Sequence, residues 1–217
     1  MKFDLHFHTT ASDGVASPEK MITMLRSRGL DGFSITDHDT VGDPETYQIL
    51  AKRYGLIFVC GIEITAREGH LLAYCGPKEI GTLKEFKPGE PVSFYVDACA
   101  QADIIISPAH PFDYFRHGIG NLVYQYRWSA LETFNGSTVF PFSNKKAEQA
   151  AERLTLPQIG GSDAHTHHYV GFAYTEADAH TGDELLKKIQ ENKTSVGGNH
   201  LNIFQFTRRM LEIKILK

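Results

Sequence analysis

One feature of the sequence limits the possible folds more than any other: short apolar runs alternate with amphipathic segments along the whole chain. Apolar runs typical of strands cover 2–8, 32–36, 56–60, 70–74, 104–106, 130–134 and 156–160. Segments that predict helices cover 17–28, 44–54, 92–101, 144–154, 182–192 and the tail 201–216. Repeated strand–helix units of this kind predict an α/β fold with a mostly parallel sheet or barrel.

Local signals mark where several of these elements begin and end. Ser17 is suited to cap a helix, and Pro18 is suited to its first position. Gly29 and Gly55 follow the first two predicted helices, where a glycine commonly ends a helix. The stretch 77–91 is rich in Lys, Glu, Gly and Pro, so we expect it to be a loop.

Length and composition favour a single domain over residues 1–217. The 217 residues include 41% hydrophobic ones, enough to bury one core, and show neither an internal repeat nor an evident linker. No stretch reaches the ~20 apolar residues of a membrane span, and the first residues lack the apolar core of a secretory signal. Three widely spaced cysteines without a CxxC pair argue against a disulfide framework. We therefore expect a reducing, cytoplasmic location.

Polar side chains gather at the ends of the predicted strands. In parallel α/β sheets the ligand side lies at the carboxyl ends of the strands, so these side chains should converge. His6 and His8 are two positions apart on a strand and point the same way, which is a chelating geometry. Asp163 and His165 repeat this spacing after the strand predicted at 156–160. The complete set is His6, His8, Asp37, His38, Glu63, His70, His110, Asp163 and His165.

The alternative is that each of these residues has only a structural role. A lone histidine at a strand end is more often a capped or surface residue than a metal ligand. So many imidazoles and carboxylates at one edge are harder to explain in that way, because buried polar groups are costly unless they are paired or metal-bound. Nitrogen and oxygen donors without thiolates suit Zn, Mn or Fe. The set exceeds the ligands that one ion needs, which predicts two or three divalent ions with hydrolytic activity.

The order of these residues resembles the PHP superfamily, whose name stands for polymerase and histidinol phosphatase. The family motifs occur in order and cover essentially the whole chain. They correspond here to His6-Phe7-His8, Thr36-Asp37-His38-Asp39, Gly61-Ile62-Glu63, Pro108-Ala109-His110-Pro111 and Gly161-Ser162-Asp163-Ala164-His165. The HxH motif alone is a weak signal, but the combination is strong.

The resemblance implies a distorted (β/α)7 barrel, similar to a TIM barrel, with a two- or three-metal site that hydrolyses phosphoesters. It also implies three groups of ligands, two of which share Glu63 as a bridging carboxylate. The groups are His6, His8, Glu63 and Asp163 for one ion, Glu63, His70 and His110 for a second, and Asp13, His38 and His165 for a third. Loss of Glu63, Asp163 or His38 should therefore reduce turnover most.

Three further residues are candidates for binding the phosphate. Arg116 follows the His110 motif and is the first candidate for an arginine clamp. Arg67 is the second, and Asn135 at the end of a predicted strand could donate to a phosphate oxygen. The alternative for each is a solvated surface residue. Asp37 and Asp39 flank His38, and we expect them to orient its ring.

The expected reaction is attack on phosphorus by a hydroxide that bridges the metal ions. Formal net charge is −4, so a small phosphorylated metabolite, a nucleotide or an oligonucleotide end is a better substrate candidate than long nucleic acid. One alternative is a C–N hydrolase of the amidohydrolase type, but such enzymes usually add a metal-bridging lysine, and no predicted strand ends with one. The other alternative is a non-catalytic metal-binding module, in which ligands tend to be lost.

Overall fold

A computed structural model of the chain describes residues 1–138 and 140–216, without the side chains of 141, 203, 206, 210 and 216. The strands are β1 (Lys2–Asp4), β2 (Gly32–Phe33), β3 (Ile57–Phe58), β4 (Cys60–Ala66), β5 (Gly69–Cys75), β6 (Ile105–Pro108), β7 (Leu131–Asn135), β8 (Gln158–Gly161), β9 (Ala173–Glu176) and β10 (Ser195–Gly198). The helices are α1 (Pro18–Ser27), α2 (Pro44–Tyr54), α3 (Ile80–Glu85), α4 (Val92–Gln101), α5 (Pro141–Leu154), α6 (Gly182–Gln190) and α7 (Ile203–Leu216). Two short 3-10 turns are η1 (Tyr114–Arg116) and η2 (Gly120–Tyr124).

The predicted helices are all present, and their ends follow from local chemistry. The Ser17 side chain accepts a hydrogen bond from the Lys20 amide and so caps α1. Gly55 ends α2 with a left-handed conformation (φ 64°), which a residue with a Cβ adopts only at a cost. None of the described helices is both long and apolar enough to cross a bilayer.

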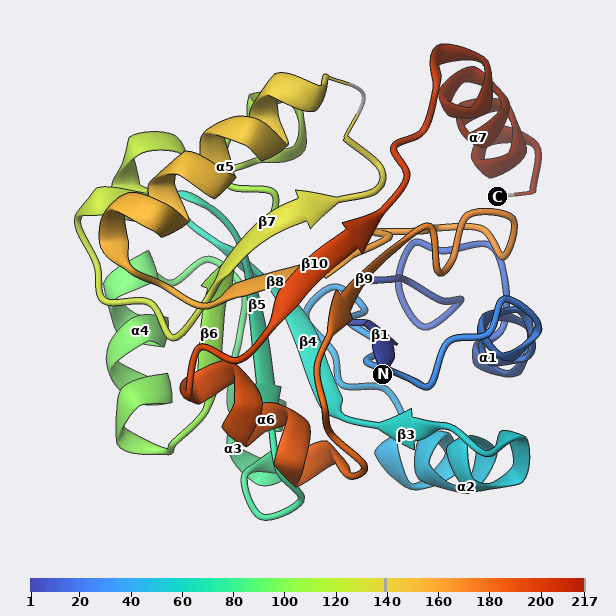
Figure 1. Ribbon diagram of the computed structural model, residues 1–217, viewed down its shortest axis with the longest axis horizontal. Coiled ribbons are helices and arrows are strands. Elements are labelled where there is room, and N and C mark those ends of the chain that lie inside the picture. Colours follow the sequence, from blue (N-terminus) through green and yellow to red (C-terminus); the bar gives the residue numbers. More distant parts are fainter. Residues whose placement is uncertain (139, 217) are drawn as a thin grey trace.

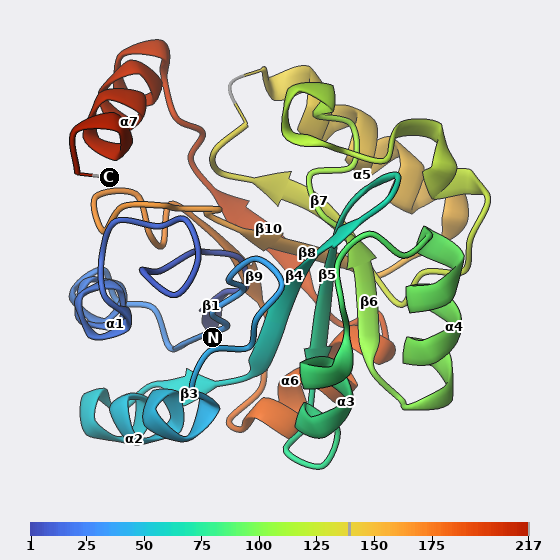
Figure 2. The same ribbon diagram turned by 180° about the vertical axis from the view of Figure 1, so that it is seen from behind.

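The strands form three sheets instead of one closed ring. The largest has the order β10-β9-β1-β2-β3, the second β4-β5-β6 and the third β7-β8. The α/β class is therefore confirmed, but the closed (β/α)7 barrel is not. Among the named strands of the described residues, three pairs are parallel (β1–β2, β2–β3 and β7–β8) and four are antiparallel, so the expectation of a mostly parallel sheet is wrong. Helices flank the sheets, with α1 and α2 on one side and α4 and α5 on the other (Figures 1 and 2).

The main departure from the predicted elements is the hairpin of β4 and β5. The apolar run 56–60 is split at Val59, because Phe58 pairs with β2 whereas Cys60 pairs with Cys75 on β5. β4 then continues to Ala66, and Gly69, with a positive φ of 151°, starts the returning strand. Strand β9 is also additional, and the stretch 77–91 contains the short helix α3 instead of being loop throughout.

A buried carboxylate joins three segments beneath the site described below. Asp4 is fully buried and accepts hydrogen bonds from the backbone N–H groups of His6 (3.3 Å), Ser162 (2.8 Å) and Gly171 (2.6 Å). Burial raises the pKa of Asp4 to about 6, even though these hydrogen bonds favour the ionised form. The side chain therefore connects the end of β1 to two loops that follow β8 and precede β9.

Substituting Asp4 should destabilise the whole domain. Asp4→Ala leaves three amide groups without their partner, and we expect the free energy of unfolding to fall by about 3 kcal/mol. Urea unfolding followed by circular dichroism measures this loss. Asp178→Ala is the matched control, because the Asp178 side chain is 90% exposed. Equal stability of the two variants would contradict the role assigned to Asp4.

Candidate metal centre

The candidate site lies where the three sheets meet. Two isolated parallel bridges connect otherwise separate strands here, one between His38 and Glu63 and one between Phe7 and Ala164. The His8 amide donates to the Ala164 carbonyl at 2.9 Å, and the Asp39 amide donates to the Glu63 carbonyl at 2.8 Å. The backbone itself thus holds the segments that carry the candidate ligands in contact with one another.

Glu63 is at the centre of the site. Its carboxylate is 1% exposed and lies against five imidazoles. Oε2 is 3.2 Å from Nε2 of His6 and 3.1 Å from Nε2 of His8. Oε1 is 3.1 Å from both Nδ1 of His70 and Nε2 of His110. Nδ1 of His38 also lies 3.6 Å from Oε2. The two oxygens therefore face different sets of rings, which is the arrangement needed for a carboxylate shared by two ions.

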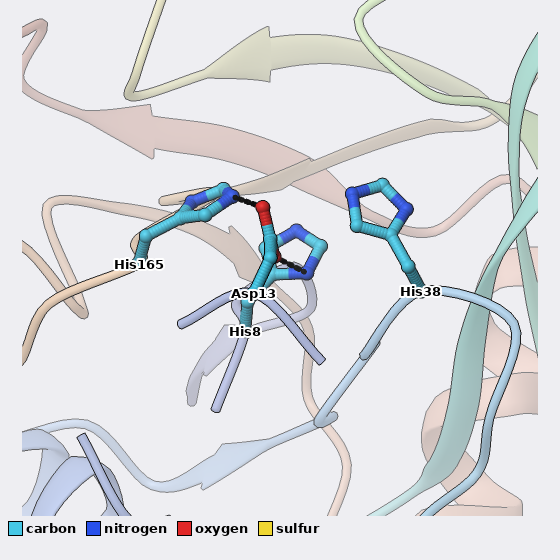
Figure 3. A group of neighbouring side chains, drawn as sticks. All are labelled: His8, Asp13, His38 and His165. Carbon is cyan, nitrogen blue, oxygen red and sulfur yellow. Dashed lines mark ion pairs between the residues drawn. The ribbon is translucent and has the colours of Figure 1, made fainter. Parts of the chain in front are cut away.

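A second group of side chains adjoins the first and comprises His8, Asp13, His38 and His165 (Figure 3). Asp13 Oδ2 is 3.0 Å from Nε2 of His165, and Asp13 Oδ1 is 3.5 Å from Nδ1 of His8. The rings of His8 and His38 stack with centroids 4.7 Å apart. Asp13 is the most accessible member, with a side chain 38% exposed. Two imidazoles thus belong to both groups: His8, and His38, whose Nδ1 is 3.6 Å from Glu63 Oε2.

Asp163 contacts side chains of both groups. Its Oδ1 is 3.5 Å from Nε2 of His8, and its Oδ2 is 3.8 Å from Nε2 of both His6 and His110. The backbone of Asp163 has a positive φ of 51°, and that of His110 has 31°. Such values cost non-glycine residues energy, so the surrounding contacts must hold both residues in place.

The electrostatics of the site differ from one imidazole to the next. Burial lowers the pKa of His110 to about 4, helped by the Arg116 charge, and burial also lowers the pKa values of His38 and His165. Burial opposes ionisation of Glu63, but His6 and the surrounding hydrogen bonds outweigh it and keep the pKa well below its ordinary value. His6 differs: burial disfavours its charge, yet Glu132 and Glu63 raise its pKa to about 9.

Several donor atoms in this site have no hydrogen-bond partner among the described residues. They are Nδ1 and Nε2 of His8, Nδ1 of His38, Nδ1 of His110 and Oδ1 of Asp163, all of them buried. Buried polar atoms without partners are costly. Neutral imidazole nitrogens and carboxylate oxygens are also the donors that Zn, Mn and Fe accept. The residues present therefore fit divalent metal ions.

The structure brings together all nine residues that the sequence suggests as ligands. These are His6, His8, Asp13, His38, Glu63, His70, His110, Asp163 and His165. Arg116 and Asn135 join them: an Nη2 hydrogen bond from Arg116 reaches Asp163 Oδ2, and Nδ2 of Asn135 donates to the same oxygen at 2.9 Å. Arg67 does not, because it is exposed at the turn between β4 and β5.

The expected role of the aspartates beside His38 is wrong. No hydrogen bond between either side chain and the His38 ring occurs in the described residues. Asp37 accepts from the amide and hydroxyl of Thr9 and from the hydroxyl of Ser12, so it fixes the loop that carries Asp13. Asp39 instead accepts from the Thr65 amide at 2.7 Å on β4.

Two residues that contact the site are not evident from the motifs. Glu132, on β7, accepts from Nδ1 of His6 at 2.8 Å and from the His110 amide, and so orients two predicted ligands. Arg209, on α7, approaches Nδ1 of His165 to 3.2 Å. A usable signal for Glu132 is an acidic residue within a predicted apolar strand. No signal in the sequence connects the tail to the site.

Comparisons with known proteins give a family model and several partly matched relatives. Residues 141–194 match the family model described as PHP-associated. A 5'-3' exoribonuclease of Haemophilus influenzae is 39% identical over 64 residues, and a 3',5'-nucleoside bisphosphate phosphatase of Chromobacterium violaceum is 35% identical over 66 residues. Each alignment spans 30% of this chain and 23% of the relative, so less than a quarter of either relative's length is matched.

A solved structure shares the fold over nearly the whole chain. It is a two-domain protein of Bacteroides vulgatus containing a predicted PHP-like metal-dependent phosphoesterase. The TM-score is 0.70 with 21% sequence identity, and the match covers 98% of this chain and 69% of that one. The similarity concerns the fold, and the chemistry has to be argued from the side chains described above.

Proposed function

We propose that this chain is a metal-dependent phosphoesterase of the PHP superfamily, with one domain over residues 1–217. The substrate that we propose is a small phosphorylated metabolite, a nucleotide or an oligonucleotide end. The observation that carries the proposal is Glu63, a buried carboxylate with imidazole nitrogens against both oxygens. The relatives named as an exoribonuclease and a bisphosphate phosphatase support phosphoester chemistry.

The proposed ligands would hold two or three divalent ions, Mn, Zn or Fe. The proposed groups are those implied by the resemblance: His6, His8, Glu63 and Asp163; Glu63, His70 and His110; and Asp13, His38 and His165. The described geometry also clusters His38 with Glu63 and His70, and His110 with His6 and Asp163. When bound, such ions supply Lewis acidity toward a phosphoryl oxygen and lower the pKa of water, so that hydroxide is available as the nucleophile at neutral pH.

The protein's own residues position the substrate and the ligands. Arg116 carries a fork of N–H donors that can bind two phosphate oxygens, and its Nη1 already donates to Asn135 Oδ1 at 3.1 Å. Burial lowers the pKa of Arg116 to about 10, which leaves it charged at neutral pH. Glu132 holds the His6 ring through Nδ1, so Nε2 faces Glu63. Arg67 is a weaker candidate for a phosphate contact, since it lies at the exposed hairpin turn.

A panel of phosphoesters tests the proposal directly. The Mn-loaded protein should release phosphate from at least one of an aryl phosphate, nucleoside mono- and bisphosphates, histidinol phosphate and a short oligonucleotide. Asp163→Ala should abolish the release, whereas the exposed Asp178→Ala should not change it. If the metal-loaded protein releases no phosphate from any of these substrates, a C–N hydrolase or a binding module would be favoured instead. The residues that surround Glu63 include no lysine, which argues against the former.

The number of ions can be tested separately. Asp13 contacts only the group with His8 and His165, and it does not contact Glu63 in the described structure. We therefore expect Asp13→Ala to lose one ion and to keep the ions held around Glu63. Metal content per chain, measured by mass spectrometry on purified protein, should fall by one relative to wild type. An unchanged content would remove Asp13 from the ligand set.

A further inference from the structure

The C-terminal helix α7 carries one buried cationic side chain, Arg209, that contacts the candidate site. Arg209 is 5% exposed, whereas Leu211 and Ile215 on the same helix are 55% and 77% exposed. In Figure 1 the helix stands apart from the sheets, beyond the end of β10. Nη2 of Arg209 is 3.2 Å from Nδ1 of His165. The only other cationic side chain beside the site ligands is Arg116, within the part of the chain that the structure describes.

Arg209 has an incomplete set of partners. Nε and Nη1 are buried and make no hydrogen bond in the described residues. The contact of Nη2 is itself a poor one, because Nδ1 of His165 also lies 3.1 Å from the Asp163 carbonyl. Nδ1 can donate to that carbonyl or accept from the guanidinium, but not both, so the two contacts compete for one atom. A buried cation with unpaired N–H groups is costly, and an anion would relieve that cost.

The two arginines approach the same part of the site from different elements. Arg116, in η1, contacts Asp163, and Arg209, in α7, contacts His165. These two contacted residues lie side by side, with Nδ1 of His165 3.6 Å from Oδ1 of Asp163. Burial lowers the pKa of Arg116 most, and the charge of Arg209 lowers it further. The two cations are therefore near enough to repel each other. An anion between them would be attracted by both.

We propose that Arg209 is a phosphate-binding residue, supplied by α7 opposite Arg116, and that the pair selects a terminal phosphoryl group. This inference rests on the proposed function. A guanidinium fork matches the spacing of phosphate oxygens. A terminal phosphoryl group carries a charge of about −1.5 to −2 and three free oxygens, which suits two guanidiniums. An internal diester has a single charge and two free oxygens, so it gains less from the second arginine.

The test compares neighbouring arginines of one helix in the full-length, metal-loaded protein. Arg209→Gln removes the buried charge, and Arg209→Lys keeps the charge without the fork. Arg208→Gln is the matched control, since Arg208 is exposed and pairs with Glu212 on the same helix. The measurements are KM and kcat for an aryl phosphomonoester and for the matched aryl phosphodiester. The dissociation constant of inorganic phosphate is measured by titration calorimetry, and metal content is determined for each variant.

We expect Arg209→Gln to raise both the dissociation constant of inorganic phosphate and the KM for the monoester by about 10- to 100-fold. Its metal content should be unchanged. The lysine variant should fall between that variant and wild type, and Arg208→Gln should behave as wild type. If Arg209→Gln does not fold, the same shifts in the lysine variant decide the question.

Two results would overturn the inference while leaving the proposed function intact. One is wild-type phosphate affinity and KM in both Arg209 variants, and the other is an equal loss toward monoester and diester. If Arg209 had a purely structural role, its variants would have a lower melting temperature and a lower kcat but an unchanged affinity for inorganic phosphate. Failure of the proposed function looks different, because then the wild-type protein itself neither binds inorganic phosphate nor releases it.

Discussion

Replacing Glu63 with glutamine should lower phosphate release by at least about 10³-fold while the protein remains folded. Glutamine keeps the size of the side chain but removes the negative charge that two ions would share. Its amide nitrogen would also face imidazole nitrogens that now lie 3.1 Å from a carboxylate oxygen. The effect should therefore combine weaker metal binding with a loss of the remaining activity.

The measurement is the initial rate of phosphate release at saturating Mn, with circular dichroism as the check on folding. Glu45→Gln is the control, because Glu45 is exposed on α2, outside the candidate site. A folded Glu63→Gln protein that retains a rate near wild type would remove Glu63 from the centre of the proposed site. Lost activity in the control would point to a general effect of the substitution instead.

Removing the divalent ions should abolish turnover and also weaken the fold. Ions that bind only the native state stabilise it by about 2.7 kcal/mol when free metal is 100 times the dissociation constant. Their ligands here come from residues as far apart as His6 and His165, which are not held together in the unfolded chain. We expect chelation to lower the melting temperature by several degrees and Mn to restore both stability and turnover.

Differential scanning fluorimetry with and without chelator measures this effect. Asp163→Ala provides the matched comparison, because Asp163 contacts ligands of both groups and its loss should reduce the metal-dependent shift. The same metal-dependent shift in wild type and Asp163→Ala would mean that the ions bind elsewhere. No shift in either protein would contradict stabilisation of the fold by metal.

Local sequence signals predicted the helices well because caps and amphipathic periodicity are encoded within a few residues. α2 and α4 have the predicted bounds, and Ser17 caps α1 as expected. Strand partners depend on distant residues, so the hairpin of β4 and β5 and the antiparallel β9 were not predicted. The barrel was expected from the resemblance, and the observed pairings leave three sheets.

The ligand candidates could be proposed because they stand in short motifs at or near strands. The structure brings them together, although Glu63 lies in the middle of β4 and His70 near the start of β5. The hairpin reverses the chain between these two strands. It therefore brings the middle of β4 and the start of β5 to the site, where the other candidate ligands follow or end their strands. Arg209 could not be predicted in this way. Its position depends on how a terminal helix packs, and no periodicity in the sequence specifies that.

The hydrogen bond between Asp4 and Ser162 has a consequence for the growing polypeptide, since it joins residues 158 positions apart. β1 lies between β2 and β9 in its sheet, so its second neighbour is made late in translation. At about 5–20 residues per second, roughly 8 to 30 s separate synthesis of the two partners. His6 and His8 therefore emerge from the ribosome long before Asp163. Any ion captured in that interval would be held by an incomplete set of ligands, and the proposed centre could be loaded fully only after His165 has been synthesised.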